Sequence, residues 1–128
     1  MLSSERRSSR SPATPRLPAD LKRALAAVVD KKALDVVLLD LRKASAFTDF
    51  FLICTGANAR QVKAIADGVD EVLRESGVRP ALVEGYERAE WVLIDCFDFI
   101  VHIFLPATRA FYDLERLWGE ARRLDIRE

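Results

Sequence analysis

The chain has 128 residues, half of them apolar, which suffices for one domain with its own hydrophobic core but not for two. Twenty basic side chains balance twenty acidic ones, so no overall field attracts polyanions and nucleic acid as the sole partner is disfavoured. The two cysteines, Cys54 and Cys96, each lie inside an apolar run, which is typical of reduced, buried thiols and of a cytoplasmic protein. The sequence has neither an apolar stretch of about 20 residues nor a secretory-signal core, so we expect neither membrane insertion nor secretion.

Residues 1–17 contain four arginines and one acid among serines and prolines, a composition that predicts a disordered basic tail. An organellar transit peptide is the less favoured interpretation, because the segment is short and shows no amphipathic helix. The tail could also make a weak, salt-sensitive contact to RNA phosphates. Residues 18–128, with sixteen basic and nineteen acidic side chains, form the single predicted domain.

Helical spacing of apolar residues begins after Pro18 and predicts the first helix. Residues 35–41 and 49–55 are short runs rich in Val, Ile and Phe, apolar on both alternating faces, which indicates strands covered on both sides. After Gly56, the pair Asn58 and Gln61 has the spacing of a helix cap, and a second helix follows as far as Gly77.

The second half of the domain adds a short strand over residues 81–84 and a hairpin of strands over 91–96 and 99–105. A last helix is predicted over residues 107–123, with 124–128 as a fraying end. The order αββαβββα predicts a single small α/β domain, a mixed five-stranded sheet with helices packed on it.

Few side chains could build a catalytic or metal site, since His102 is the only histidine. On its strand it is expected to be buried or half-buried and hydrogen-bonded to a neighbour. Four aspartates near strand ends could hold cations for a phosphoryl transferase, but no Asp-x-Asp pair occurs, and turn N–H groups explain such aspartates equally well. The turn at Gly56 could accept an anion, without a recognised phosphate-binding motif. These aspartates are Asp40, Asp49, Asp95 and Asp98.

The last helix offers candidate contact residues. Its apolar arc is expected to face the core, whereas Tyr112, flanked by Arg109 and Arg116, lies on the opposite side. A Tyr/Arg surface is typical of binding hot spots, although an ordinary solvated face explains it nearly as well. Trp91, after a polar loop that displays Tyr86, could belong to the core or to a contact surface. The arc comprises Phe111, Leu114, Leu117, Trp118 and Ala121.

Several segments in order resemble the ribosomal silencing factor family, also called Iojap-like, from the first helix to about Arg122. They are residues 48–56 (TDFFLICTG), 60–62 (RQV), 84–85 (EG), 91–95 (WVLID), 101–104 (VHIF), Arg109 and 111–118 (FYDLERLW). The resemblance implies a fold similar to nucleotidyltransferases without their catalytic carboxylates, and no cofactor. It also implies binding to the large ribosomal subunit through that subunit's fourteenth protein, exclusion of the small subunit, repression of translation under starvation, and a homodimer when free.

The resemblance also assigns roles to residues. Those expected to bind the partner are Glu84, Trp91, Arg109, Tyr112 and Glu115, while Asp95 and His102 are expected to orient the hairpin, or to contact the partner, and could bond one another. The family usually has Gly-Asp in the hairpin turn where this chain has Phe97 and Asp98, so either the turn geometry differs or Phe97 packs locally at some backbone cost.

Two other classes of function remain open from the residues alone. A nucleotidyl or phosphoryl transferase would use the strand-end aspartates with magnesium. A homodimeric scaffold without a ribosomal role would self-associate and bind no subunit.

Overall fold

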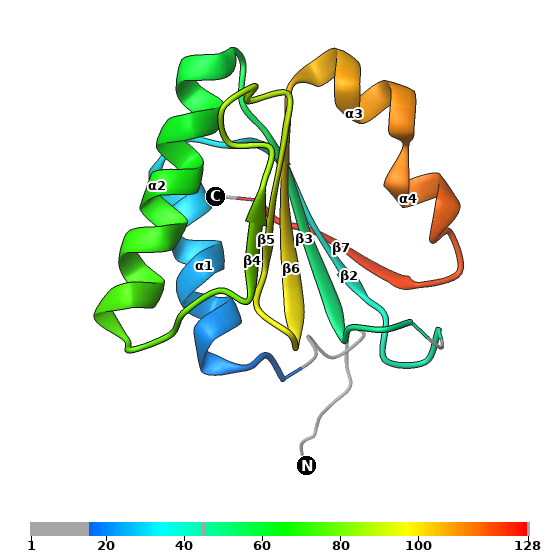
Figure 1. Cartoon of the computed structure of the whole chain (residues 1–128). Helices are drawn as coiled ribbons and strands as arrows, with labels where there is room; N and C mark the ends of the chain where they lie inside the picture. The colour runs from blue at the N-terminus through cyan, green and yellow to red at the C-terminus, as the bar shows by residue number, and fades with distance from the viewer. Residues whose placement is uncertain (1–15, 45, 128) are drawn as a thin grey trace.

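The structure is a computed structural model that describes residues 16–44 and 46–127. Within these residues one six-stranded sheet lies between two pairs of helices, α1 and α2 on one face and α3 and α4 on the other (Figure 1). None of the helices in this part of the chain is long and apolar enough to cross a membrane. In chain order the elements are α1 (Ala19–Asp30), β2 (Leu34–Asp40), β3 (Phe50–Thr55), α2 (Ala59–Glu75), β4 (Leu82–Glu84), β5 (Trp91–Asp95), β6 (Phe99–Phe104), α3 (Pro106–Tyr112), α4 (Leu114–Leu117) and β7 (Arg122–Asp125).

The sheet is mixed, with the strand order β4-β5-β6-β3-β2-β7. Only the central pair β3–β6 is parallel among the described strands, and the other neighbours are antiparallel. Parallel neighbours need a long connection, and α2 with β4 and β5 supplies it. The single α/β domain with a mixed sheet, expected from the pattern of strands and helices, is thus confirmed.

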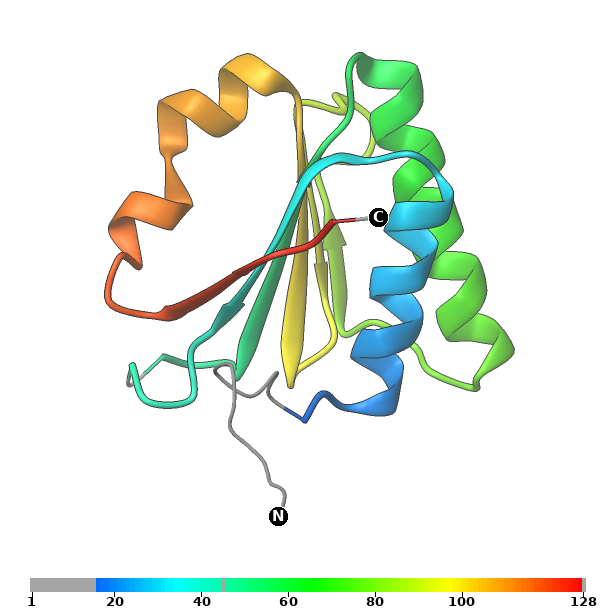
Figure 2. The ribbon, with the colours of Figure 1, turned by 180° about the vertical axis from the view of Figure 1, so that it is seen from behind.

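The larger core lies between the sheet and the long helices α1 and α2. Leu21 and Val28 of α1 and Ile65 and Val69 of α2 are fully buried, at the helical spacing seen in the sequence. The expected cap of α2 is also present, because Asn58 Oδ1 accepts a hydrogen bond from the Gln61 backbone N–H at 2.9 Å. Both long helices pack into this one core and so cover the same face of the sheet, as the view from behind also shows (Figure 2).

The C-terminal part differs from the prediction of one helix over residues 107–123 and a fraying end. The helix breaks at Asp113, whose φ of 49° is left-handed, and only short α4 follows. Residues 122–125 then form β7, which pairs with β2 as a sixth strand. The five-strand count was wrong because an edge strand of four residues, three of them charged, has little apolar alternation by which to be recognised.

The β5–β6 turn holds a phenylalanine in a left-handed backbone conformation. Phe97 has a φ of 68° and is 73% exposed, so it does not pack locally. Its backbone is held by two side chains: Asp95 Oδ1 accepts from the Phe97 N–H at 2.9 Å, and the Thr48 hydroxyl donates to the Phe97 carbonyl at 2.7 Å. These hydrogen bonds offset the strain of a left-handed phenylalanine.

Candidate partner-binding surface

Trp91 is the centre of an aromatic cluster on the sheet face that α3 and α4 cover. Its half-buried indole lies 4.9 Å from the Phe104 ring and 4.8 Å from the Tyr112 ring, measured between centroids. Gly85 makes room for the start of β5, because a Cβ at Gly85 would overlap the Trp91 carbonyl oxygen. Trp91 therefore belongs to the core and to the surface at once, which answers the question left open by the sequence.

His102 is the buried neighbour of Trp91 in this cluster. It is 3% exposed, and its Nδ1 accepts a hydrogen bond from Trp91 Nε1 at 3.1 Å, so the predicted buried histidine with a neighbouring partner is confirmed. Burial lowers the pKa of His102 to about 3, which keeps the ring neutral with its proton on Nε2. Nε2 has no hydrogen-bond partner within the described residues, and the imidazole lies edge to face against Phe51 at 4.5 Å.

Asp95 and His102, which could have bonded one another, have other partners instead. The register places Leu93 opposite His102 and Ile100 opposite Asp95. The Asp95 carboxylate accepts from the Phe97 N–H in the turn, while His102 is used by Trp91. The two residues stabilise the hairpin separately, one at its turn and one under the indole.

Arg109 fixes the position of α3. Its Nη1 donates to the Thr55 hydroxyl at 2.8 Å and to the Asp35 carbonyl at 2.7 Å, which ties the helix to the ends of β2 and β3. Its Nε and Nη2 donate to Glu115 Oε2 at 3.2 and 2.7 Å, which folds α4 back towards α3. The Arg109 and Glu115 side chains are only 12% and 14% exposed, so this ion pair braces the segment that carries Tyr112.

The braced segment presents aromatic rings to solvent. Tyr112 is 51% exposed although it packs on Trp91, and Phe111, edge to face with Tyr112 at 5.0 Å, is 79% exposed. The helical wheel placed Phe111 and Leu117 in the core, and these two assignments were wrong because the helix does not continue past Asp113. Tyr112, which the wheel placed away from the core, is exposed but also packs on Trp91. The wheel was right for Leu114, which is buried.

Glu84 belongs to the same face of the sheet. It is exposed on β4 and pairs with Leu93 of β5, which shares the side of Trp91. Tyr86, expected in a displayed loop, is instead half-buried, and its hydroxyl donates to Asp67 Oδ1 at 2.9 Å. We call the set Glu84, Trp91, Phe111 and Tyr112 the aromatic face. Phe111 is the member that the sequence did not predict, and an Asp at position 113, a residue that tolerates positive φ, was the available signal.

Two of the four strand-end aspartates, Asp40 and Asp95, accept hydrogen bonds from residues two positions away. Arg42 donates to both carboxylate oxygens of Asp40, at 3.0 and 2.7 Å, and these hydrogen bonds lower the pKa of Asp40. Over the described ranges no group of three or more His, Cys, Asp or Glu side chains could hold a metal ion. Both cysteines are free, and burial raises the pKa of each thiol to about 12.

The fold and this surface define a small α/β protein with an aromatic patch on the more thinly covered face of its sheet. The chain matches the family model described as "Ribosomal silencing factor during starvation" over residues 14–128, and it belongs to that family. Ribosomal silencing factor RsfS of Halalkalibacterium halodurans is 47% identical over 83% of this chain and 91% of its own length. RsfS of Bacillus subtilis is 42% identical over 83% of this chain and 90% of its own length.

A solved structure agrees with this assignment. The crystal structure of a Chromobacterium violaceum protein superposes with a TM-score of 0.75 and 43% sequence identity, covering 78% of this chain and 83% of that one. The family resemblance expected from the sequence is therefore confirmed.

Proposed function

We propose that the protein binds the large ribosomal subunit through that subunit's fourteenth protein, sterically excludes the small subunit and thereby represses translation when nutrients are limiting. Membership of the ribosomal silencing factor family supports the ribosomal target. The observation that carries the proposed contact is the exposure of Phe111 and Tyr112 on a segment braced by Arg109. Rigid exposed aromatic rings supply contact area with little loss of side-chain entropy.

The proposed contact divides the predicted partner-binding residues by role. Trp91 and Tyr112 supply apolar area, and the exposed Glu84 carboxylate is available to a basic group of the partner. Arg109 and Glu115 contribute by holding Tyr112 in place, since most of their polar atoms already bond within the chain. The mechanism occupies a surface and requires no cofactor or chemical step.

The same proposal includes three further properties. The free protein is a homodimer and acts in the cytoplasm. The basic tail of residues 1–17, of which residues 1–15 lie outside the described part of the chain, adds a weak contact to ribosomal RNA whose strength falls with salt.

Sucrose-gradient sedimentation tests the proposal. Purified protein is added to separated subunits before magnesium-driven reassociation, with variants Phe111→Asp and Tyr112→Asp, both at exposed positions. Phe97→Asp is the matched control, because Phe97 is 73% exposed, close to the 79% of Phe111. Phe97 lies in the turn after the last residue of β5, whereas Trp91 is the first residue of that strand.

The wild type and the Phe97→Asp control should sediment with the large subunit and reduce the joined-subunit peak, and the two aromatic-face variants should do neither. If the wild type stays at the top of the gradient and subunits rejoin normally, the proposed function is wrong. If Phe111→Asp and Tyr112→Asp act like the wild type, the ribosome contact lies elsewhere on the protein.

A further inference from the structure

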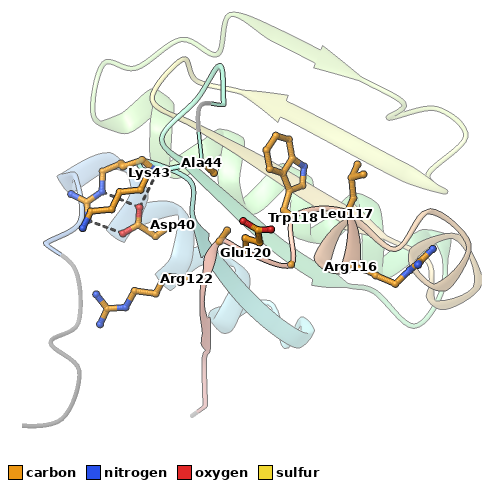
Figure 3. A pocket seen from close by; sticks show the side chains of 11 residues that line it. Asp40, Lys43, Ala44, Arg116, Leu117, Trp118, Glu120 and Arg122 are labelled. Carbon is orange, nitrogen blue, oxygen red and sulfur yellow. Dashed lines mark hydrogen bonds and ion pairs between the residues drawn. The ribbon is translucent and has the colours of Figure 1, made fainter.

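One cavity of the described residues is lined by none of the four residues of the aromatic face. It has a volume of about 910 Å³ and opens between the end of β2 with the loop after it and the turn that joins α4 to β7 (Figure 3). This volume falls within the range of about 300–1,000 Å³ typical of small-molecule sites. The lining residues that carry the argument are Arg42, Lys43, Leu117, Trp118, Glu120 and Arg122.

The lining has an apolar side and a charged side. Trp118 and Leu117 lie together, and Lys43, Asp40 and Arg122 gather at the opposite side (Figure 3). The half-buried Trp118 ring is fixed by its perpendicular contact with Phe51, at 5.9 Å between centroids. Leu117, beside it, is 72% exposed.

The cavity is positively charged although the domain is not. Four basic side chains and two carboxylates line it, which leaves an excess of two positive charges, whereas residues 18–128 carry more acids than bases. Asp40 holds Arg42 in a fixed orientation through the two hydrogen bonds described above. Lys43 is exposed and makes no ion pair with any residue that the structure describes, so its ammonium is available to an anion.

We propose that this cavity binds a nucleoside phosphate, with the base against Trp118 and Leu117 and the phosphate towards Lys43, Arg42 and Arg122. An indole stacks on any base, and Arg and Lys are the usual partners of phosphate. The Glu120 carboxylate, which lies between the two sides in Figure 3, can accept hydrogen bonds from a base amino group or a ribose hydroxyl. A bare anion would leave the apolar side unused, and an acidic peptide would bring carboxylates towards Asp40 and Glu120.

The bound nucleoside phosphate could be a free nucleotide or one nucleotide of an RNA strand, and titration calorimetry separates these two ligands. The full chain is titrated with ATP, AMP and single-stranded hexaadenylate, and with inorganic tripolyphosphate and hexaglutamate as anions without a base. Lys43→Glu and Leu117→Asp change exposed cavity residues, and Lys22→Glu on α1 is the control, because it alters net charge equally on the other side of the sheet.

ATP and hexaadenylate should bind, and Lys43→Glu and Leu117→Asp should each weaken binding at least about tenfold while Lys22→Glu does not. Hexaadenylate binding far tighter than AMP identifies an RNA strand as the source, and similar affinities identify a free nucleotide. Tripolyphosphate or hexaglutamate binding as tightly as ATP would overturn the proposal, as would no binding at millimolar concentration or binding that both cavity variants leave unchanged. None of these titrations contains ribosomes, so their failure leaves the proposed ribosome contact untouched.

Discussion

Replacing His102 with Phe should remove most of the loss of stability that the protein suffers in mild acid. The folded protein holds His102 neutral, with a pKa of about 3 lowered by burial, against 6.5 for an ordinary histidine. Because the folded pKa is the lower one, the unfolded chain binds the extra proton first, and acid favours unfolding. The effect begins as the pH falls below about 6.5 and grows until about pH 3.

The magnitude follows from these two pKa values. Between about pH 7.5 and about pH 5, protonation of the unfolded chain lowers the free energy of unfolding by about 2 kcal/mol. The chain has one histidine, so no other imidazole titrates in this interval. Phe fills a similar volume and cannot titrate, but it leaves the Trp91 Nε1 donor without its acceptor, at a cost of about 1 kcal/mol at both pH values.

Urea unfolding followed by tryptophan fluorescence at the two pH values measures the effect. The wild type should lose about 2 kcal/mol more than His102→Phe on acidification, and the variant should be the less stable protein at about pH 7.5. Equal acid sensitivity in the two proteins would refute the reasoning, because it would mean that His102 can be protonated within the folded state at little cost.

Three further predictions concern other parts of the fold. Arg109→Met leaves the nearly buried Glu115 carboxylate without its partner and should lower the free energy of unfolding by about 2 kcal/mol, part of which an added Glu115→Gln restores in urea titrations. Phe97→Gly removes the strain of a left-handed phenylalanine and loses little buried surface, so it should raise the free energy of unfolding by about 0.5–1 kcal/mol. An unchanged or lower midpoint of thermal unfolding would mean that the Phe97 backbone is not strained. Iodoacetamide should modify the half-buried Cys96 before the fully buried Cys54 in the folded protein, both slowly because burial raises both pKa values, and mass spectrometry would reveal the reverse order.

The elements with strong local signals were predictable to within a residue or two. Strand β3 was expected over residues 49–55 and runs from Phe50 to Thr55, because an uninterrupted apolar run between polar ends suits a central strand buried on both faces. Helix α2 was equally clear, since its cap residues Asn58 and Gln61 act on neighbouring backbone and its apolar spacing is regular.

The candidate surface was predictable in part. Trp91 and Tyr112 were singled out as contact candidates, and both lie on the aromatic face, but the reason given for Tyr112 assumed a helix that the structure interrupts. Phe111 was missed for the same reason: the left-handed residue at Asp113 separates Phe111 from residues 114–121, so the single apolar arc drawn through all of them does not exist in the fold. A periodicity argument holds only while the helix continues.

Taken alone, the sequence determined the properties that depend on neighbours along the chain: the single α/β domain, the central strands, the two long helices and the family. Tertiary structure decided what depends on residues far apart. Arg109 bonds to Asp35, 74 positions away, Trp91 donates to His102 across the hairpin, and β7 pairs with β2. Such contacts exist only once the sheet has formed, because loop closure brings their members together and no local pattern records the partner.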